Sequence, residues 1–149
     1  MRAKCVLCFL GFTMLGIPIV ANEHISFDNA VVRRPLASQD FTAAYVDITN
    51  HSDSPVTIAG ASASWIGGIE FHETVFADGR VLMNRVTRLV LEPHATFHLA
   101  PGDTHLMLFR LKLNGVSNPT ITFVTMEGED LRVPFEIKRT DALDHFTGH

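Results

Sequence analysis

Cysteine is almost absent from this sequence, and both copies lie near its start. Of 149 residues, only Cys5 and Cys8 are cysteine, and both precede the point at which we expect the chain to be cut. The mature protein would then have no disulfide, although disulfides are the usual cross-links of small exported domains. A cysteine nucleophile and a thiolate metal ligand are excluded as well. The hydrophobic core alone must therefore stabilise the fold.

The first 21 residues have the layout of a secretory signal peptide. Arg2 and Lys4 make a short basic start, residues 5–20 are largely apolar, and Ala21 precedes a polar stretch. An N-terminal membrane anchor is the alternative, but the apolar run is short for a membrane span. We therefore expect residues 1–21 to be a signal peptide that directs the protein to the periplasm.

Basic residues are scarce in the part that is expected to fold. The whole chain has 12 basic and 16 acidic residues and a net charge of −4. Without Arg2 and Lys4, 10 basic residues stand against 16 acidic ones, a net charge of −6. This balance favours solubility and argues against nucleic acid as a partner. We expect one monomeric domain over residues 22–138 and a flexible tail over residues 139–149.

The sequence also lacks the local patterns of common enzyme sites. It contains no glycine-rich phosphate loop, and no serine stands in the pattern of a nucleophile elbow. With no cysteine in the mature chain, we expect a binding protein rather than an enzyme.

Short alternating apolar runs between turn residues dominate the chain after residue 24, and no long stretch keeps a helical period. Asp78-Gly79 is typical of a tight hairpin turn. Residues 61–68 are mostly small and predict a loop. This pattern predicts an all-β fold, an antiparallel sandwich or barrel. The expected strands are residues 25–32, 43–49, 56–59, 69–76, 81–85, 87–91, 96–99, 105–111, 120–125 and 131–138.

Four soft side chains have a regular spacing within this pattern. Ten residues separate His72 from Met83, twenty-one separate Met83 from His105, and one separates His105 from Met107. In a strand, residues two apart face the same side, so His105 and Met107 should point together. The Asp78-Gly79 turn should bring His72 towards Met83. Three strands could thus gather four ligands at one edge of a sandwich.

Two imidazoles and two thioethers form a neutral, soft ligand set that suits Cu(I) better than Cu(II). Thioethers need no deprotonation and form no disulfides, so they remain ligands in an oxidising compartment. A blue-copper electron carrier also uses histidine and methionine, but it needs a cysteine thiolate. The expected loss of both cysteines argues against that class.

The spacing resembles the motif of the PCu(A)C family of periplasmic copper chaperones, and His72, Met83, His105 and Met107 match all four of its positions. The wider match comprises Ala44-Tyr45, Ile48-Thr49-Asn50, Phe71-His72-Glu73 and residues 101–108.

The resemblance implies a cupredoxin-like β-sandwich that binds Cu(I). It further implies a copper-accepting partner, either a respiratory terminal oxidase subunit or another copper chaperone, with membrane contact only through a membrane-bound partner. The chain departs from the family at Glu73, where many members have a methionine. An auxiliary thioether is therefore not expected.

Other histidines offer weaker candidates for a second copper, held as Cu(II). His94 and His98 could share a face, although solvated loop positions are the simpler interpretation. His145 and His149 lie in the polar tail. His24 would become the third residue after a cut at Ala21, and an amine with a nearby imidazole suits tetragonal Cu(II).

Two other functions remain open at this stage. Copper sequestration for metal tolerance would use the same four ligands as delivery. A metal-free sandwich could instead serve as an interaction module, in which the histidines are solvated and the methionines only fill space.

Overall fold

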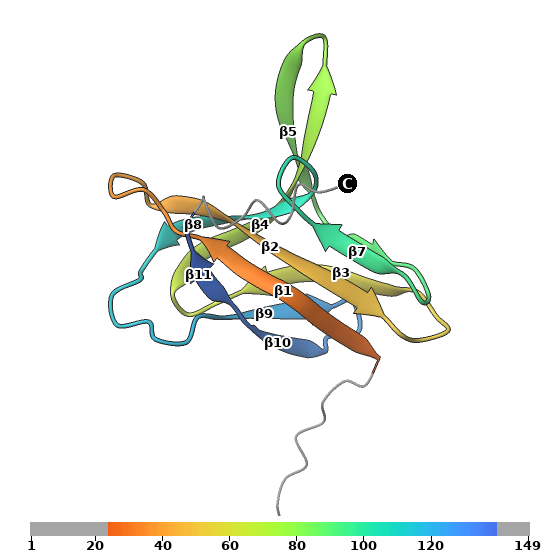
Figure 1. Cartoon of the computed structure of the whole chain (residues 1–149). Coiled ribbons are helices and arrows are strands. Elements are labelled where there is room, and N and C mark those ends of the chain that lie inside the picture. Colours follow the sequence, from red (N-terminus) through yellow and green to blue (C-terminus); the bar gives the residue numbers. More distant parts are fainter. Residues whose placement is uncertain (1–23, 140–149) are drawn as a thin grey trace, which may run out of the picture.

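The computed structural model describes residues 24–139. Within this range the chain forms eleven strands and no helix (Figure 1). No helix in the described part is long and apolar enough to cross a membrane. The strands are β1 (Ile25–Arg33), β2 (Phe41–Asn50), β3 (Val56–Ser62), β4 (Ile66–Ala77), β5 (Arg80–Val86), β6 (Leu89–Leu91), β7 (Thr96–Leu99), β8 (His105–Leu111), β9 (Thr120–Thr125), β10 (Asp130–Pro134) and β11 (Glu136–Lys138).

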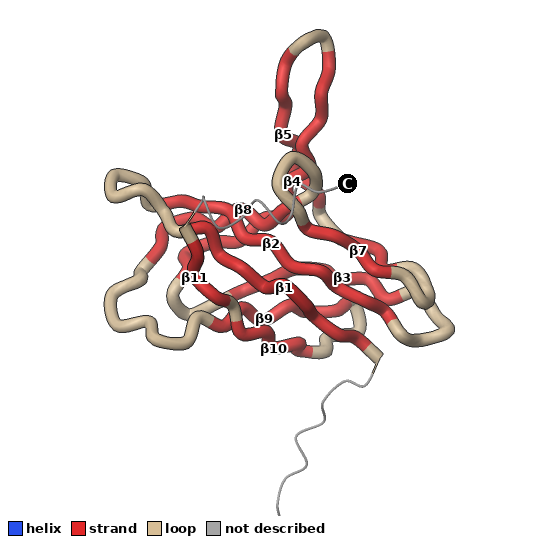
Figure 2. Tube along the Cα trace, in the orientation of Figure 1, coloured by secondary structure: helices blue, strands red, loops and turns tan. Residues whose placement is uncertain are grey.

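The strands form two sheets that pack face to face (Figure 2). The larger sheet has the order β11-β1-β2-β8-β4-β5, and β7 also pairs with β2. The smaller sheet has the order β10-β9-β3-β6. All pairs are antiparallel except β1 with β11, which is parallel. The predicted all-β sandwich is confirmed, with this one parallel pair as a departure from a purely antiparallel arrangement.

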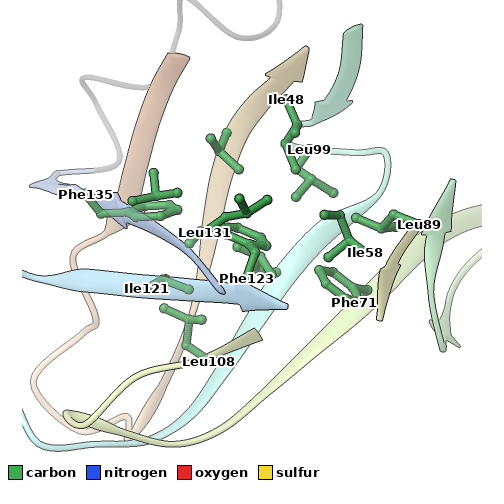
Figure 3. Packing of buried hydrophobic residues seen from close by; sticks show 14 of the residues in the cluster. Ile48, Ile58, Phe71, Leu89, Leu99, Leu108, Ile121, Phe123, Leu131 and Phe135 are labelled. Atoms are coloured by element: carbon green, nitrogen blue, oxygen red, sulfur yellow. The ribbon is translucent and has the colours of Figure 1, made fainter. Parts of the chain in front are cut away.

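The core lies between the two sheets (Figure 3). Leu106 and Leu108 face it from β8, and Ile121 and Phe123 face it from β9, each with no exposed surface. The ring of Phe27 stacks on Phe123 with centroids 5.2 Å apart. Each such side chain contributes about 1.5–3 kcal/mol by leaving water. Strand alternation therefore turns the residues between them, such as Met107, to the outer face of the larger sheet.

The hairpin of β4 and β5 projects away from the two sheets (Figure 1). Its turn residues, Asp78 and Gly79, both have positive φ, at 51° and 71°. Two successive left-handed residues give a turn whose twist matches that of the flanking strands, and Asp-Gly tolerates this conformation well. The predicted hairpin turn is confirmed.

The expected loop over residues 61–68 is wrong at both ends. β3 continues to Ser62, and β4 begins at Ile66, so only residues 63–65 lie outside strands. Gly67 lies in β4, and the Arg110 side chain crosses the strand at this residue. A Cβ on Gly67 would lie 2.6 Å from Arg110 Nε, and Arg110 Nη2 donates a hydrogen bond to the Gly67 carbonyl at 2.5 Å. A small side chain here marks a close approach rather than a loop.

The expected strand over residues 131–138 is two strands. β10 pairs with β9 in the smaller sheet, and β11 pairs with β1 in the larger one. The chain changes sheets at Phe135, whose side chain is 4% exposed and packs in the core. Apolar residues alternate without a break from Leu131 to Ile137, with Pro134 as the only turn residue among them, and this continuous pattern hid the crossing. Elsewhere, the expected strand over residues 87–91 shortens to Leu89–Leu91.

Candidate metal centre

His72 and His105 lie opposite each other on neighbouring strands. β4 and β8 pair antiparallel, and the register places His72 directly against His105. Their ring centroids are 6.4 Å apart. Directly opposed residues of an antiparallel pair share a face of the sheet, so both rings stand on the outer face. Sequence reasoning did not predict that these two histidines form a cross-strand pair.

The two methionines lie on opposite sides of this histidine pair, on the same face. Met107 stands opposite Glu70, two residues before His72, and Met83 stands opposite Thr74, two residues after it. The four side chains thus come from β4, β5 and β8, the three strands that the sequence indicated. The two histidines meet directly, whereas the methionines occupy the rows that flank them.

The methionines differ in burial. Met107 is partly buried against Val31, Ala43 and Tyr45, and burial raises the pKa of the Tyr45 hydroxyl, an effect that the charge of Arg33 partly opposes. Met83 is 57% exposed on the projecting hairpin. One thioether is therefore held by the sheet, and the other is open to solvent.

His105 is oriented by the backbone. Its Nδ1–H donates a hydrogen bond to the Asp103 carbonyl at 2.9 Å, and the residue is only 5% exposed. A neutral imidazole carries one N–H, so this bond leaves the lone pair of Nε2 available to a metal.

His72 is oriented by a carboxylate, which leaves its other ring nitrogen without a hydrogen bond. Its Nε2–H donates to Glu70 Oε2 at 2.9 Å. Its Nδ1 is buried and has no hydrogen-bond partner in the described structure. A buried polar atom without a partner costs free energy, and in a native structure it calls for an explanation such as an ion. A metal bound to Nδ1 would satisfy this atom.

Glu70 also contacts Arg85, which stands opposite His72 on β5. Arg85 Nη1 lies 3.5 Å from Glu70 Oε1. The hydrogen bond from His72 lowers the pKa of Glu70, burial opposes this, and the charge of Arg85 lowers the pKa further. The sequence analysis missed both residues. The available signal was the position of Glu70, two residues before His72 on the same face of a strand.

The donor set favours a soft ion. Within residues 24–139 no group of three or more His, Cys, Asp or Glu side chains could hold a metal ion. The donors that the strands bring to this face are the two imidazoles and the two thioethers. Two neutral nitrogens and two neutral sulfurs suit Cu(I). Glu73 pairs with Asn84 and faces away from His72 by strand alternation, so position 73 does not point towards the histidine pair.

The remaining histidines do not form a second centre in the described structure. His94 Nε2 lies 2.8 Å from Asp53 Oδ1, and His98 Nδ1 lies 2.7 Å from Asp47 Oδ1. Each thus has its own carboxylate. His98 lies in strand β7, which has the bounds of the expected strand over residues 96–99.

The backbone carbonyl of His24 accepts a hydrogen bond from the amide of His51 at 2.7 Å. His145, His149, the expected signal peptide and nearly all of the expected tail lie outside the described residues.

The model of the LpqE-like family, described as "Putative lipoprotein LpqE-like", matches residues 25–137. "Putative lipoprotein Lxx21020" of Leifsonia xyli subsp. xyli (strain CTCB07) is 34% identical over 77 residues, which are 51% of this chain and 46% of that protein. The match thus spans less than half of that relative.

Solved structures with the same fold are PCuAC domains. The copper-bound PCuAC domain from PmoF2 has a TM-score of 0.64 at 20% identity, over 78% of this chain and 93% of that one. The Cu(I) form of DR1885 from Deinococcus radiodurans has a TM-score of 0.63 at 27% identity, over 82% and 83% of the two chains. These matches confirm the resemblance to the PCu(A)C family.

Proposed function

This chain belongs to the LpqE-like family, and we propose that it is an exported metallochaperone that binds Cu(I) and passes it to a partner protein. The observation that carries this proposal is the cross-strand pair of His72 and His105, in which His72 Nδ1 is buried without a partner. The copper-bound PCuAC relatives support the same assignment.

In this proposal His72 binds through Nδ1 and His105 through Nε2, because their other nitrogens are engaged as hydrogen-bond donors. Met83 and Met107 supply thioether sulfurs. All four ligands are neutral, so the bound ion keeps its full single charge, and this favours Cu(I) over Cu(II). Copper is the cargo here, and no chemical step is required of the protein.

Transfer would proceed by ligand exchange. Met83 is the most exposed of the four residues and lies on the projecting hairpin, so an incoming ligand would displace it first. Phe76 and Val81 stand opposite each other near the hairpin turn and are 73% and 59% exposed. They share the face of Met83 and offer an apolar contact surface to the acceptor.

We further propose that the protein acts in the periplasm and that the acceptor is a copper centre of a respiratory oxidase or another copper chaperone. The family name refers to lipoproteins. In this chain, however, Cys8 follows Val6 and Leu7 rather than a small residue. Lipid attachment at Cys8 therefore stays outside the proposal.

The second copper of the sequence analysis is not part of this proposal. His94 and His98 are each paired with a separate exposed or partly exposed carboxylate. The arrangement proposed for His24 depends on residues 22 and 23, and that for His145 and His149 depends on the tail. Residues 22 and 23, His145 and His149 all lie outside the described part of the chain.

A competition titration tests the site. The mature protein is titrated with Cu(I) against a chelator of known affinity, and we expect tight binding of one ion. The Met83→Ala, Met107→Ala double variant should lose this binding. Met126→Ala is the matched control, because Met126 is similarly exposed, at 59%, but follows β9 in the other sheet. Tight one-to-one binding by the double variant would contradict the assignment.

Delivery and sequestration use the same ligands, but they predict different effects of deleting the gene. A delivery role predicts that deletion lowers oxidase activity under copper scarcity, and that the wild-type gene, but not the double variant, restores it. A sequestration role predicts instead poor growth under copper excess. Absence of Cu(I) binding by the purified protein would support the third possibility, a metal-free interaction module.

A further inference from the structure

We propose that Glu70 is a positioning residue for copper, which orients His72 so that its Nδ1 faces the ion, and that Arg85 in turn holds Glu70. This inference rests on the proposed function, because it concerns the same site. It adds two residues that touch no metal and that the spacing of the four ligands does not include.

The three side chains share one face of the larger sheet. Glu70 and His72 are two residues apart on β4, and Arg85 is the cross-strand partner of His72 on β5. One carboxylate oxygen of Glu70 accepts the His72 Nε2–H at 2.9 Å, and the other lies 3.5 Å from Arg85 Nη1. Glu70 thus uses its two oxygens for two different neighbours, which fixes the plane of the carboxylate.

The hydrogen bond selects both a tautomer and a ring orientation. A carboxylate only accepts hydrogen bonds, so the proton of neutral His72 must be on Nε2. The free lone pair is then on Nδ1, the buried atom that has no hydrogen-bond partner in the described structure. A ring rotated by half a turn about the Cβ–Cγ bond would place Cδ2–H in the position of Nδ1 instead, and this carbon could not bind a metal. A carboxylate behind a ligating histidine also makes the imidazole a stronger donor.

The two histidines are therefore oriented by different means. His105 donates to a backbone carbonyl of Asp103, whose position the chain itself sets. His72 depends on a side chain, and this side chain is 32% exposed. Substitution can remove the support of His72 without changing the backbone, whereas the support of His105 cannot be removed in this way.

The first arm of the test uses the metal-free mature protein. In the wild type we expect the His72 Nε2–H proton to give a distinct NMR resonance that is protected from exchange with water. Glu70→Ala should abolish this resonance. Glu70→Gln should retain it, because the amide oxygen can still accept the hydrogen bond. Glu73→Ala is the matched control, since Glu73 is the adjacent acidic residue on β4 but faces away from His72.

The second arm measures Cu(I) affinity by chelator competition. Loss of the carboxylate behind a ligating histidine typically weakens metal binding about 10–100-fold, and we expect a loss of this size in Glu70→Ala. Glu70→Gln should lose less. Arg85→Ala should lose less than about 5-fold, because it removes only an exposed ion pair. Glu73→Ala should bind as the wild type does.

The outcomes separate this inference from the proposed function. If the wild type binds no Cu(I), the proposed function fails, and the positioning role towards copper fails with it. If the wild type binds Cu(I) but Glu70→Ala keeps both the protected proton and the affinity, only the positioning role is overturned. An equal loss of Cu(I) affinity in Glu73→Ala would also overturn the positioning role, because the loss of one negative charge on β4 would then explain both variants. Circular dichroism of each variant verifies that the sheet is intact.

Discussion

Two histidine–carboxylate pairs stand on the outer face of the same sheet, and only one of them belongs to a candidate metal site. His72 donates to Glu70 at 2.9 Å, and His98 donates to Asp47 at 2.7 Å. By hydrogen-bond length the pairs are alike. Their surroundings differ, because the side chain of His72 is 17% exposed and that of His98 is 64% exposed.

The difference lies in the second nitrogen and in the neighbours. His72 Nδ1 is buried without a partner, His72 stands directly opposite His105, and thioethers flank this histidine pair. His98 is largely exposed to water. Its carboxylate already accepts a second hydrogen bond, from Asn29 Nδ2 at 2.7 Å. A carboxylate partner thus orients a histidine at either place, but burial and converging soft donors are what make a copper site.

Removal of each imidazole in turn should give the largest difference in Cu(I) affinity between the two pairs. His72→Ala should weaken Cu(I) binding by about 100-fold or more, since a ligand matters at least as much as the residue behind it. His98→Ala should leave the affinity within about 2-fold, because surface changes away from a site have small effects. Chelator competition measures both variants. Equal losses in the two variants would remove the distinction between the pairs.

Replacement of the exposed thioether tests whether the sulfur donors beside His72 contribute to copper binding, while both histidine–carboxylate pairs stay intact. Met83→Leu keeps the apolar volume and removes the sulfur, and we expect a loss of Cu(I) affinity of about 10-fold, on the scale of single metal-site contacts. Stability should hardly change, since Met83 is 57% exposed. Met126→Leu is the control. Wild-type affinity in Met83→Leu would show that this sulfur is not a ligand.

The pair at Asp47 should matter for stability rather than for copper. Asp47 accepts hydrogen bonds from Asn29 and His98 and is 19% exposed. Asp47→Ala should lower the free energy of unfolding by about 1–3 kcal/mol, because it removes two hydrogen bonds to a partly exposed carboxylate. Urea denaturation of the metal-free protein gives this value, and chelator competition should show unchanged Cu(I) affinity. A weakened affinity would mean that the two regions are coupled.

The smallest expected effect is the pH dependence of stability at Glu70. The hydrogen bond from His72, with help from Arg85, lowers the pKa of Glu70 from its ordinary value of 4.5. A carboxyl group whose pKa is lower in the folded state stabilises the fold above the unfolded value, and this contribution is lost as the pH falls through the folded value.

The metal-free wild type should therefore lose its advantage in Tm over Glu70→Gln as the pH is lowered from neutral to about 3, because the carboxylate becomes protonated. Thermal unfolding followed by circular dichroism at a series of pH values measures this difference. A difference in Tm that stays constant over the whole range would contradict the lowered pKa.

Local patterns in the sequence were sufficient for much of the fold. The Asp78-Gly79 turn follows from the conformational preferences of two residues, and β8 and β9 have the predicted bounds. The crossing at Phe135 was missed, because an apolar residue can face either sheet and only the pairing of β10 and β11 separates them. Gly67 was read as loop because the contact with Arg110 joins residues 43 positions apart in the chain.

For the site, the spacing predicted the strands and the shared face of His105 and Met107, but not the register between strands. That register is what opposes His72 to His105 and Arg85 to His72. It depends on packing of the whole sheet, which no local pattern contains. Glu70 and Arg85 therefore emerged only from the structure, and the ligand set itself stays a prediction.

The central claim is that two imidazole nitrogens and two thioether sulfurs bind one Cu(I), and X-ray absorption at the copper edge of the Cu(I)-loaded mature protein tests it most directly. The edge should be that of Cu(I), and the fine structure should require both sulfur and imidazole scatterers in equal number. The sulfur contribution should fall by half in Met83→Leu. A spectrum of the wild type that is fitted by nitrogen and oxygen alone would contradict the account.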